Sequence, residues 1–228
     1  MSGTRRAFHE ELAEVQGDVV RLGAMATEAV QAGTDALLDA DLSAVERVVL
    51  NDGHLDALTH GIEARCYQLL ARQQPMAVDM RTLVTVLRVI HELERAGDLM
   101  VNVAKTARRL FPATLDPKVR GIVHRMREQA ACQLYLAVSA FADRDPRQAA
   151  VLAEMDDDMD ELQKELFRVI FGSQVDDDAA VQRAVQIALV GRYFERIADH
   201  AVNTGERVAY MVTGSFRDVE NPGSLNAR

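Results

Sequence analysis

Hydrophobic residues recur at helical spacing along nearly the whole chain. In the first segment, Leu12, Val15, Val19 and Leu22 follow one another at intervals of three or four residues, which places them on one face of an α-helix. Similar amphipathic runs follow, and short breaks containing Pro, Gly, Asp or Ser separate them. The pattern predicts an all-α fold of six long helices, over residues 5–38, 43–71, 78–110, 117–141, 145–172 and 178–212, with no strand.

Several residues at these breaks are typical of helix ends. Ser43 follows the break at 39–42 and is the predicted N-cap of the second helix. Pro117 suits the first turn of the fourth helix, where a missing N–H does no harm. Gly214 is expected to end the sixth helix.

An internal repeat is the most informative feature of the sequence. Residues 93–102 and 194–203 both read Leu or Phe, then Glu-Arg-x-x-Asp, then Asn four positions after the aspartate. One helix earlier, residues 52–56 and 156–160 each begin and end with Asp. The chain is therefore predicted to form two tandem three-helix bundles related by a pseudo-twofold repeat, with a first repeat at 1–113, a second at 114–214 and a flexible tail at 215–228.

The acidic pairs are spaced so that they meet in space. Residues four apart share a helix face. If the second and third helices form an antiparallel hairpin, Asp56 faces Glu94 and Asp52 faces Asp98, because each of these pairs is symmetric about Pro75. The second-repeat pairs are symmetric about the 174–178 break in the same way, and an Asn extends the stripe in each repeat. The candidate site residues are Asp52, Asp56, Glu94, Asp98 and Asn102 in the first repeat and Asp156, Asp160, Glu195, Asp199 and Asn203 in the second.

Four carboxylates at close range repel one another, and desolvating them costs several kcal/mol per charge. Either the pairs point into water, or cations bind between them. Oxygen donors suit hard or borderline ions, so Mg²⁺, Mn²⁺ or Fe are the expected metals, with Zn²⁺ as a further candidate.

Composition and charge exclude other classes. The formal net charge of −9 repels a phosphate backbone, so no nucleic-acid partner is expected. The two cysteines, Cys66 and Cys132, lie far apart without a CxxC partner and are predicted to be buried thiols in a reducing compartment. No apolar run approaches the length of a membrane span. Arg5-Arg6 is followed by Ala-Phe-His-Glu-Glu instead of an apolar export segment, so a cytoplasmic location is expected.

The repeated motif resembles the E(D)xxxD signature of the PhoU family, whose members contain two tandem three-helix repeats with such a motif on the last helix of each. The resemblance covers residues 5–213. Glu94 and Asp98 match the first motif, and Glu195 and Asp199 match the second. The acidic positions on the partner helices are matched by Asp52, Asp56, Asp156 and Asp160.

The two repeats differ within this motif. Gly97 in the first repeat is replaced by Ala198 in the second, and both are small enough for close helix approach. Leu99 stands where the second repeat has His200, which makes the two sites chemically unequal.

The resemblance implies a function. PhoU-like proteins are negative regulators of the phosphate-starvation response, and they couple the ATPase of the phosphate ABC transporter to a sensor histidine kinase through protein contacts. Family members can bind metal clusters through these motifs, and they commonly form homodimers. The resemblance therefore implies a protein that is not an enzyme and that reaches the membrane only through its partners.

Two alternatives stay open. One is a di-metal carboxylate enzyme of the ferritin-like type, although the Glu-x-x-His spacing of such sites is missing from the third and sixth predicted helices. The other is a metal-free helical scaffold with solvated acidic stripes. The sequence contains no glycine-rich phosphate loop and no serine or cysteine with a credible histidine base.

Overall fold

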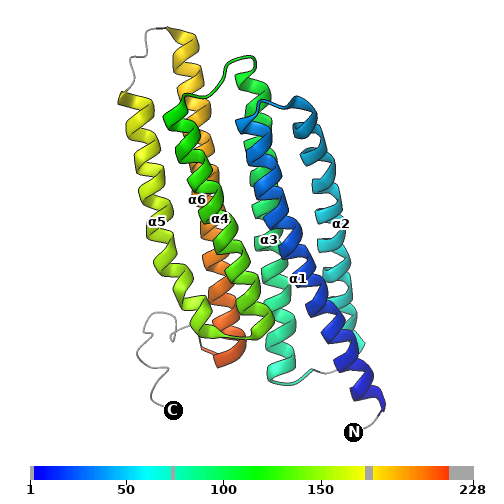
Figure 1. The fold of residues 1–228 in the computed structure, drawn as a ribbon. Coiled ribbons are helices and arrows are strands. Elements are labelled where there is room, and N and C mark those ends of the chain that lie inside the picture. Colours follow the sequence, from blue (N-terminus) through cyan, green and yellow to red (C-terminus); the bar gives the residue numbers. More distant parts are fainter. Residues whose placement is uncertain (1–2, 73–74, 173–176, 216–228) are drawn as a thin grey trace.

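The computed structural model describes residues 3–72, 75–172 and 177–215. The six predicted helices are confirmed (Figure 1), and their ends differ from the predicted ones by at most two residues. Their bounds are α1 Gly3–Leu38, α2 Leu42–Arg72, α3 Val78–Leu110, α4 Pro117–Asp143, α5 Pro146–Gly172 and α6 Asp178–Thr213. Nothing in the described ranges forms a β-strand, as the hydrophobic pattern predicts.

The helix ends follow from local hydrogen bonding, with one correction. Ser43 is not the cap of α2, because the Asp41 side chain accepts hydrogen bonds from the backbone N–H groups of Ser43 and Ala44. Asp41 therefore takes the N-cap position, two residues earlier than expected, and satisfies N–H groups that have no partner within the helix. Pro117 lies in the first turn of α4, and Gly214 ends α6 with a φ of 76°, which a glycine adopts without steric cost.

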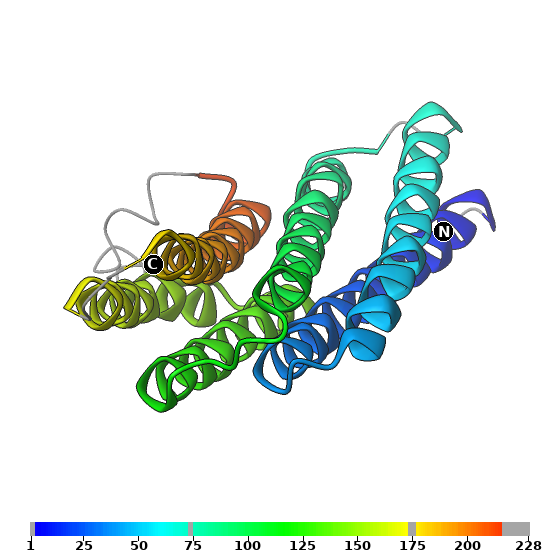
Figure 2. The same ribbon diagram turned by 90° about the horizontal axis from the view of Figure 1, so that it is seen from above.

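The helices form two three-helix bundles that pack side by side. Within each bundle every helix contacts the other two, α1 to α3 in one and α4 to α6 in the other. The bundles meet where α3 packs on α6 and α1 packs on α4, so α2 and α5 lie at the two flanks (Figure 2). α1 begins and α6 ends at the same end of the molecule (Figure 1).

Contacts between the bundles are close. A Cβ added at Gly23 on α1 would overlap the side chain of Val138 on α4. Between the central helices, Thr85 Oγ1 donates to the Arg207 carbonyl and Arg81 Nε donates to the Met211 carbonyl, both at 3.4 Å. These contacts join the two repeats into one continuous hydrophobic core.

The repeat extends to the burial pattern. When the two repeats are aligned so that Asp52 matches Asp156, buried residues of α1 and α2 match buried residues of α4 and α5. Ile62 and Leu166 are one such buried pair. The domain boundary at 113 and 114 stays a prediction, and the predicted tail lies outside the described residues except for Ser215.

The two cysteines are free thiols, but only one is buried. Cys66 is fully buried, and burial raises the pKa of its thiol to about 11. Cys132 is exposed on α4, so the prediction of two buried thiols is wrong for it. None of the helices that the structure describes has an apolar stretch long enough to span a membrane.

Candidate functional site

The α2–α3 hairpin brings the four predicted carboxylates of the first repeat together. Asp52 interacts electrostatically with Asp56, Asp98 and Glu94, and Glu94 interacts with Asp98 and Asp56. Gly97 allows this approach of α3 to α2, since a Cβ at that position would lie 3.0 Å from Leu55 Cδ1 and 3.6 Å from Asp52 Oδ1.

The charges in this cluster repel one another. Partial burial, followed by the neighbouring carboxylates, raises the pKa of Asp52 to about 6. Burial and then Asp98 raise the pKa of Glu94. Arg95 offsets part of this repulsion, as it lies 3.7 Å from a Glu94 oxygen and 3.5 Å from an Asp98 oxygen. The cluster is thus an incompletely compensated negative site, which a bound cation would stabilise.

The α5–α6 hairpin repeats the arrangement. Burial, and then the charge of Asp199, raise the pKa of both Asp156 and Glu195, and Asp160 adds to both effects. Arg192 donates to Glu195 Oε1. The other oxygen, Glu195 Oε2, is buried without a hydrogen-bond partner in the described structure.

The two asparagines of the predicted sites are placed differently. Asn102 is half-buried on α3, and its part in a site stays a prediction. Asn203 Nδ2 donates to Glu92 Oε2 on α3 at 3.4 Å. Asn203 therefore contacts a residue of the first repeat, and this hydrogen bond does not involve the carboxylates of its own hairpin.

Glu92 is the centre of this crossing contact. The Nδ1 atom of His200 lies 2.7 Å from Glu92 Oε2. Burial alone would raise the pKa of Glu92, but the hydrogen bonds from His200 and Asn203 and the charge of Arg207 outweigh it and lower the pKa. The Nδ1 atom of His200 is thus occupied by a contact with α3. The first repeat cannot form the matching contact, because Leu99 occupies the corresponding position.

The carboxylate clusters fit a hard cation by their chemistry. Each supplies several oxygen donors with raised pKa values, and the second includes the unpartnered Glu195 oxygen. In the part of the chain described here, no three His, Cys, Asp or Glu side chains converge tightly enough to form a ready-made ion site. Ion binding would therefore require these carboxylates to turn toward a common centre.

Two functional neighbours were missed from the sequence. Arg192 pairs with Glu195, and its position three residues earlier on the same helix is the sequence signal that could have shown this pairing. Glu92 faces α6, and no spacing within one repeat could show that, because the contact depends on how the repeats pack.

The fold and site define a class of protein: two tandem three-helix repeats, each with a carboxylate cluster on one hairpin. The PhoU domain family matches residues 19–107 and 123–208, one segment in each repeat. The chain belongs to the PhoU family.

Named relatives and solved structures agree with this assignment. The phosphate-specific transport system accessory protein PhoU homolog 1 of Mycobacterium tuberculosis is 36% identical over 211 residues, which covers 92% of this chain and 95% of that protein. Homolog 2 of the same species is 35% identical over 213 residues, or 93% and 99% of the two chains.

The crystal structure of PhoU from Pseudomonas aeruginosa matches with a TM-score of 0.85 and 30% identity, and covers 91% of this chain and all of that one. The phosphate transport system regulatory protein PhoU from Streptococcus pneumoniae matches with a TM-score of 0.83 and 26% identity, over 92% and 98% of the two chains.

Proposed function

We propose that this protein is a negative regulator of the phosphate-starvation response that couples the phosphate ABC transporter ATPase to a sensor histidine kinase. The observation that carries the proposal is the family match in both repeats, together with relatives named for phosphate-specific transport and its regulation. We place the protein in the cytoplasm as a homodimer that reaches the membrane only through these partners.

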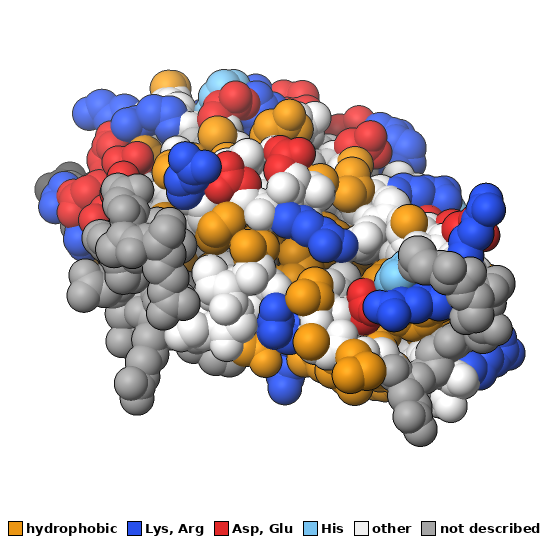
Figure 3. Space-filling view, turned by 90° about the horizontal axis from the view of Figure 1, so that it is seen from below, with side chains coloured by type: hydrophobic (Ala, Val, Ile, Leu, Met, Phe, Trp, Pro, Cys, Tyr) orange, Lys and Arg blue, Asp and Glu red, His pale blue; other side chains and the backbone are white. Residues whose placement is uncertain are grey.

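The surface is suited to contact with proteins. Figure 3 looks onto the end of the molecule where α3 begins and α6 ends, and hydrophobic side chains are spread between basic ones there. Met76, Val78 and Met80 are exposed at the start of α3. Exposed apolar side chains interspersed with charges are typical of protein interfaces, so the proposed mechanism is contact and not catalysis.

The carboxylate clusters are the proposed metal sites. In the first repeat Asp52, Asp56, Glu94 and Asp98 would hold the ion; the matching set in the second repeat is Asp156, Asp160, Glu195 and Asp199. A bound Mg²⁺, Mn²⁺, Fe or Zn²⁺ ion would neutralise the clustered charge and cross-link the two helices of each hairpin. The long helices would then keep the shape that the partners bind.

Binding assays with the purified ATPase and the cytoplasmic part of the kinase test the proposal. The unmodified protein is expected to bind both. The double variant Glu195→Ala/Asp199→Ala should lose metal and bind the partners more weakly, because α5 and α6 are no longer cross-linked.

The variant Asp157→Asn/Asp158→Asn is the matched control, since it removes two exposed carboxylates of α5 outside the predicted site. It should keep metal and partner binding. If the double alanine variant lacks metal but binds its partners as tightly as the unmodified protein, the link between metal and partner binding is wrong. If the unmodified protein binds neither partner, the regulatory proposal itself is wrong.

A further inference from the structure

The side chains next to the carboxylate clusters differ in charge between the two repeats. When α2 is aligned on α5 through their aspartate pairs, His60 in the first repeat matches Lys164 in the second. When α3 is aligned on α6 through the Glu-Arg-x-x-Asp motif, His91 matches Arg192. Each of these positions lies one helical turn from a cluster carboxylate, on the side of the hairpin loop. Histidine can be uncharged near neutral pH, whereas lysine and arginine stay cationic.

In the second repeat both cations act on the cluster. Arg192 donates a hydrogen bond to Glu195 Oε1. Burial is the main cause of the raised pKa of Glu195, and Arg192 offsets part of that rise. Glu161, and then Asp160, raise the pKa of Lys164, so its charge also lies close to the cluster. An ion in this cluster would therefore compete with Arg192 for Glu195 and be repelled by Lys164.

The two histidines of the first repeat contact other groups. His60 Nδ1 lies 2.8 Å from the backbone carbonyl oxygen of Asp56 and donates to it, because a carbonyl oxygen only accepts. His91 Nε2 lies 3.7 Å from Glu63 Oε1. Neither contact occupies a carboxylate oxygen of the cluster, so these contacts leave its oxygens available to an ion.

Arg95 and Lys105 are cations near the first cluster, and they compensate its charge only in part. The Arg95 side chain lies 3.5 Å from an Asp98 oxygen and 3.7 Å from a Glu94 oxygen, which are longer distances than a normal hydrogen bond. Burial and three carboxylates raise the pKa of Asp52 by more than Lys105 lowers it, so that it stays at about 6.

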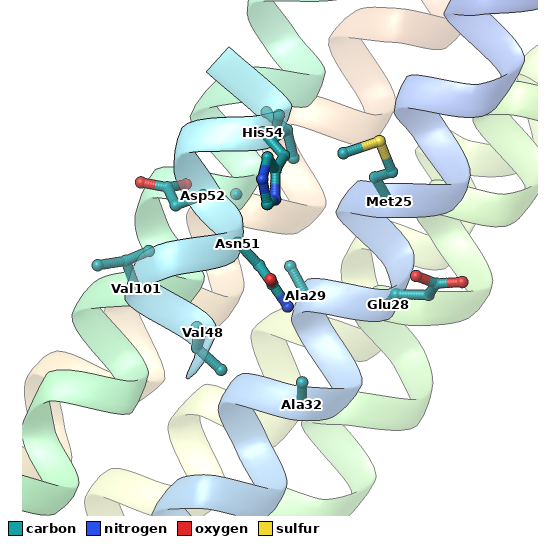
Figure 4. Close-up of a pocket in the computed structure, with 11 residues that line it drawn as sticks. Met25, Glu28, Ala29, Ala32, Val48, Asn51, Asp52, His54 and Val101 are labelled. Carbon is teal, nitrogen blue, oxygen red and sulfur yellow. The ribbon is translucent and has the colours of Figure 1, made fainter. Parts of the chain in front are cut away.

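The cavity between α1 and α2 adds no cation to the first cluster. Figure 4 shows Asp52 directed away from α1, whereas Asn51 and His54 are directed between the two helices. The described residues that line this cavity, which has a volume of about 350 Å³, include Met25 and Ala29 of α1 but no Lys or Arg. The first cluster is therefore the less compensated of the two.

We propose that the two clusters are unequal metal sites: the first repeat holds the high-affinity site, and Lys164 and Arg192 are built-in counter-ions that weaken metal binding in the second. The inference rests on the proposed function, which assigns metal to both clusters, and adds the residues that set their affinities. Positive charge beside the ligands reduces the attraction of a cation. At a limiting concentration of metal, only the α2–α3 hairpin would then be cross-linked.

Each cluster is first measured alone. The variant Asp156→Asn/Asp160→Asn keeps only the first cluster, and Asp52→Asn/Asp56→Asn keeps only the second. Binding of Mn²⁺ to each full-length protein is followed at pH 8 through the electron paramagnetic resonance signal of the free ion. The first cluster is expected to bind Mn²⁺ at least tenfold more tightly than the second. Equal affinities, or tighter binding by the second cluster, would overturn the proposal.

Exchanging the flanking residues should then exchange the affinities. In the protein that keeps only the first cluster, His60→Lys/His91→Arg should weaken Mn²⁺ binding at least tenfold. In the protein that keeps only the second, Lys164→His/Arg192→His should tighten it at least tenfold. Lys164→His alone, at an exposed position of α5, should act in the same direction if the double variant does not fold. Affinities that stay the same in these variants would show that the flanking charges do not set them.

The control removes two positive charges elsewhere. Arg21→His/Lys118→His, at exposed positions of α1 and α4, should leave the affinity of the second cluster unchanged. A control that tightens Mn²⁺ binding as much as Lys164→His/Arg192→His would reduce the effect to net charge and refute the counter-ion role.

The outcomes separate the two levels of inference. If both clusters bind Mn²⁺ equally, the inequality is wrong and the proposed metal sites stand. If neither single-cluster protein nor the unmodified protein binds Mn²⁺, the proposed metal sites fail, and the difference between them fails as well.

Discussion

At the scale of single residues, the main feature is the unfavourable environment of the ionised Asp52 side chain. Its carboxylate is half-buried among Asp56, Glu94 and Asp98, and its pKa rises from 3.8 to about 6. A carboxylate with a raised pKa favours the folded state while protonated and opposes it when ionised. In the absence of metal, the stabilising contribution is complete below the unfolded pKa of 3.8 and is lost as the pH rises through about 6.

The variant Asp52→Asn should remove this pH dependence. In buffer containing EDTA, we expect it to unfold with a free energy about 1 kcal/mol higher than that of the unmodified protein at pH 7.5 and nearly equal at pH 4. This figure is reduced for solvent screening of a partly exposed group. Urea unfolding at both pH values measures it. Glu11→Gln, at an exposed position of α1, is the control and should have no effect, and an Asp52→Asn variant less stable at pH 7.5 would contradict the account.

The contact between Glu92 and His200 should contribute measurably to the free energy of unfolding. The lowered pKa of Glu92 means that its contribution is present at neutral pH and is lost as the pH falls through the acidic range. A double-mutant cycle with Glu92→Gln and His200→Leu, the latter introducing the residue of the first repeat, should give a coupling energy of about 1–2 kcal/mol at pH 7. Additive effects in urea unfolding would show that the contact contributes nothing.

At the scale of helices, close packing between the repeats depends on Gly23. A Cβ there would overlap Val138, a stiff β-branched side chain on α4, whereas a Cβ at Gly17 of the same helix would have open space around it. Alanine substitutions at these two glycines should therefore change the free energy of unfolding in opposite directions. Gly23→Ala should lower the free energy of unfolding by about 1–3 kcal/mol, and Gly17→Ala should raise it by about 0.5–1 kcal/mol. Thermal and urea unfolding measure both, and equal effects would contradict the packing of α1 on α4.

Helix periodicity and break residues are local properties, which explains how much of the fold could be predicted from the sequence. Pro117 and Gly214 marked helix ends correctly, and the symmetric spacing about Pro75 placed Asp52 near Asp98. The prediction for Ser43 was wrong because Asp41, two residues earlier, already accepts hydrogen bonds from the N–H groups of Ser43 and Ala44 and so begins the helix there.

The features that the sequence could not predict depend on how the repeats and helices pack. The partner of His200 on α3 and the exposure of Cys132 are set by contacts between distant segments. A pattern read along one helix does not contain that information.

At the scale of the whole molecule, metal should stabilise both repeats. An ion that binds only the folded protein raises the free energy of unfolding, by roughly 2.7 kcal/mol at a concentration 100 times its Kd. We expect Mn²⁺ to raise the thermal midpoint of the unmodified protein, and Asp52→Asn/Asp56→Asn and Asp156→Asn/Asp160→Asn each to lose part of that rise. Asp157→Asn/Asp158→Asn should keep all of it. A full response in both site variants would place the metal elsewhere.

The regulatory role is tested most directly in cells. An alkaline phosphatase reporter of phosphate starvation is measured in a strain that lacks this protein and is grown with abundant phosphate. The account predicts that the reporter is active in this strain, that the unmodified chain silences it, and that a variant with Glu94, Asp98, Glu195 and Asp199 all changed to Ala silences it incompletely. A reporter that stays silent without the protein, or stays active when the unmodified chain is restored, would contradict the regulatory role.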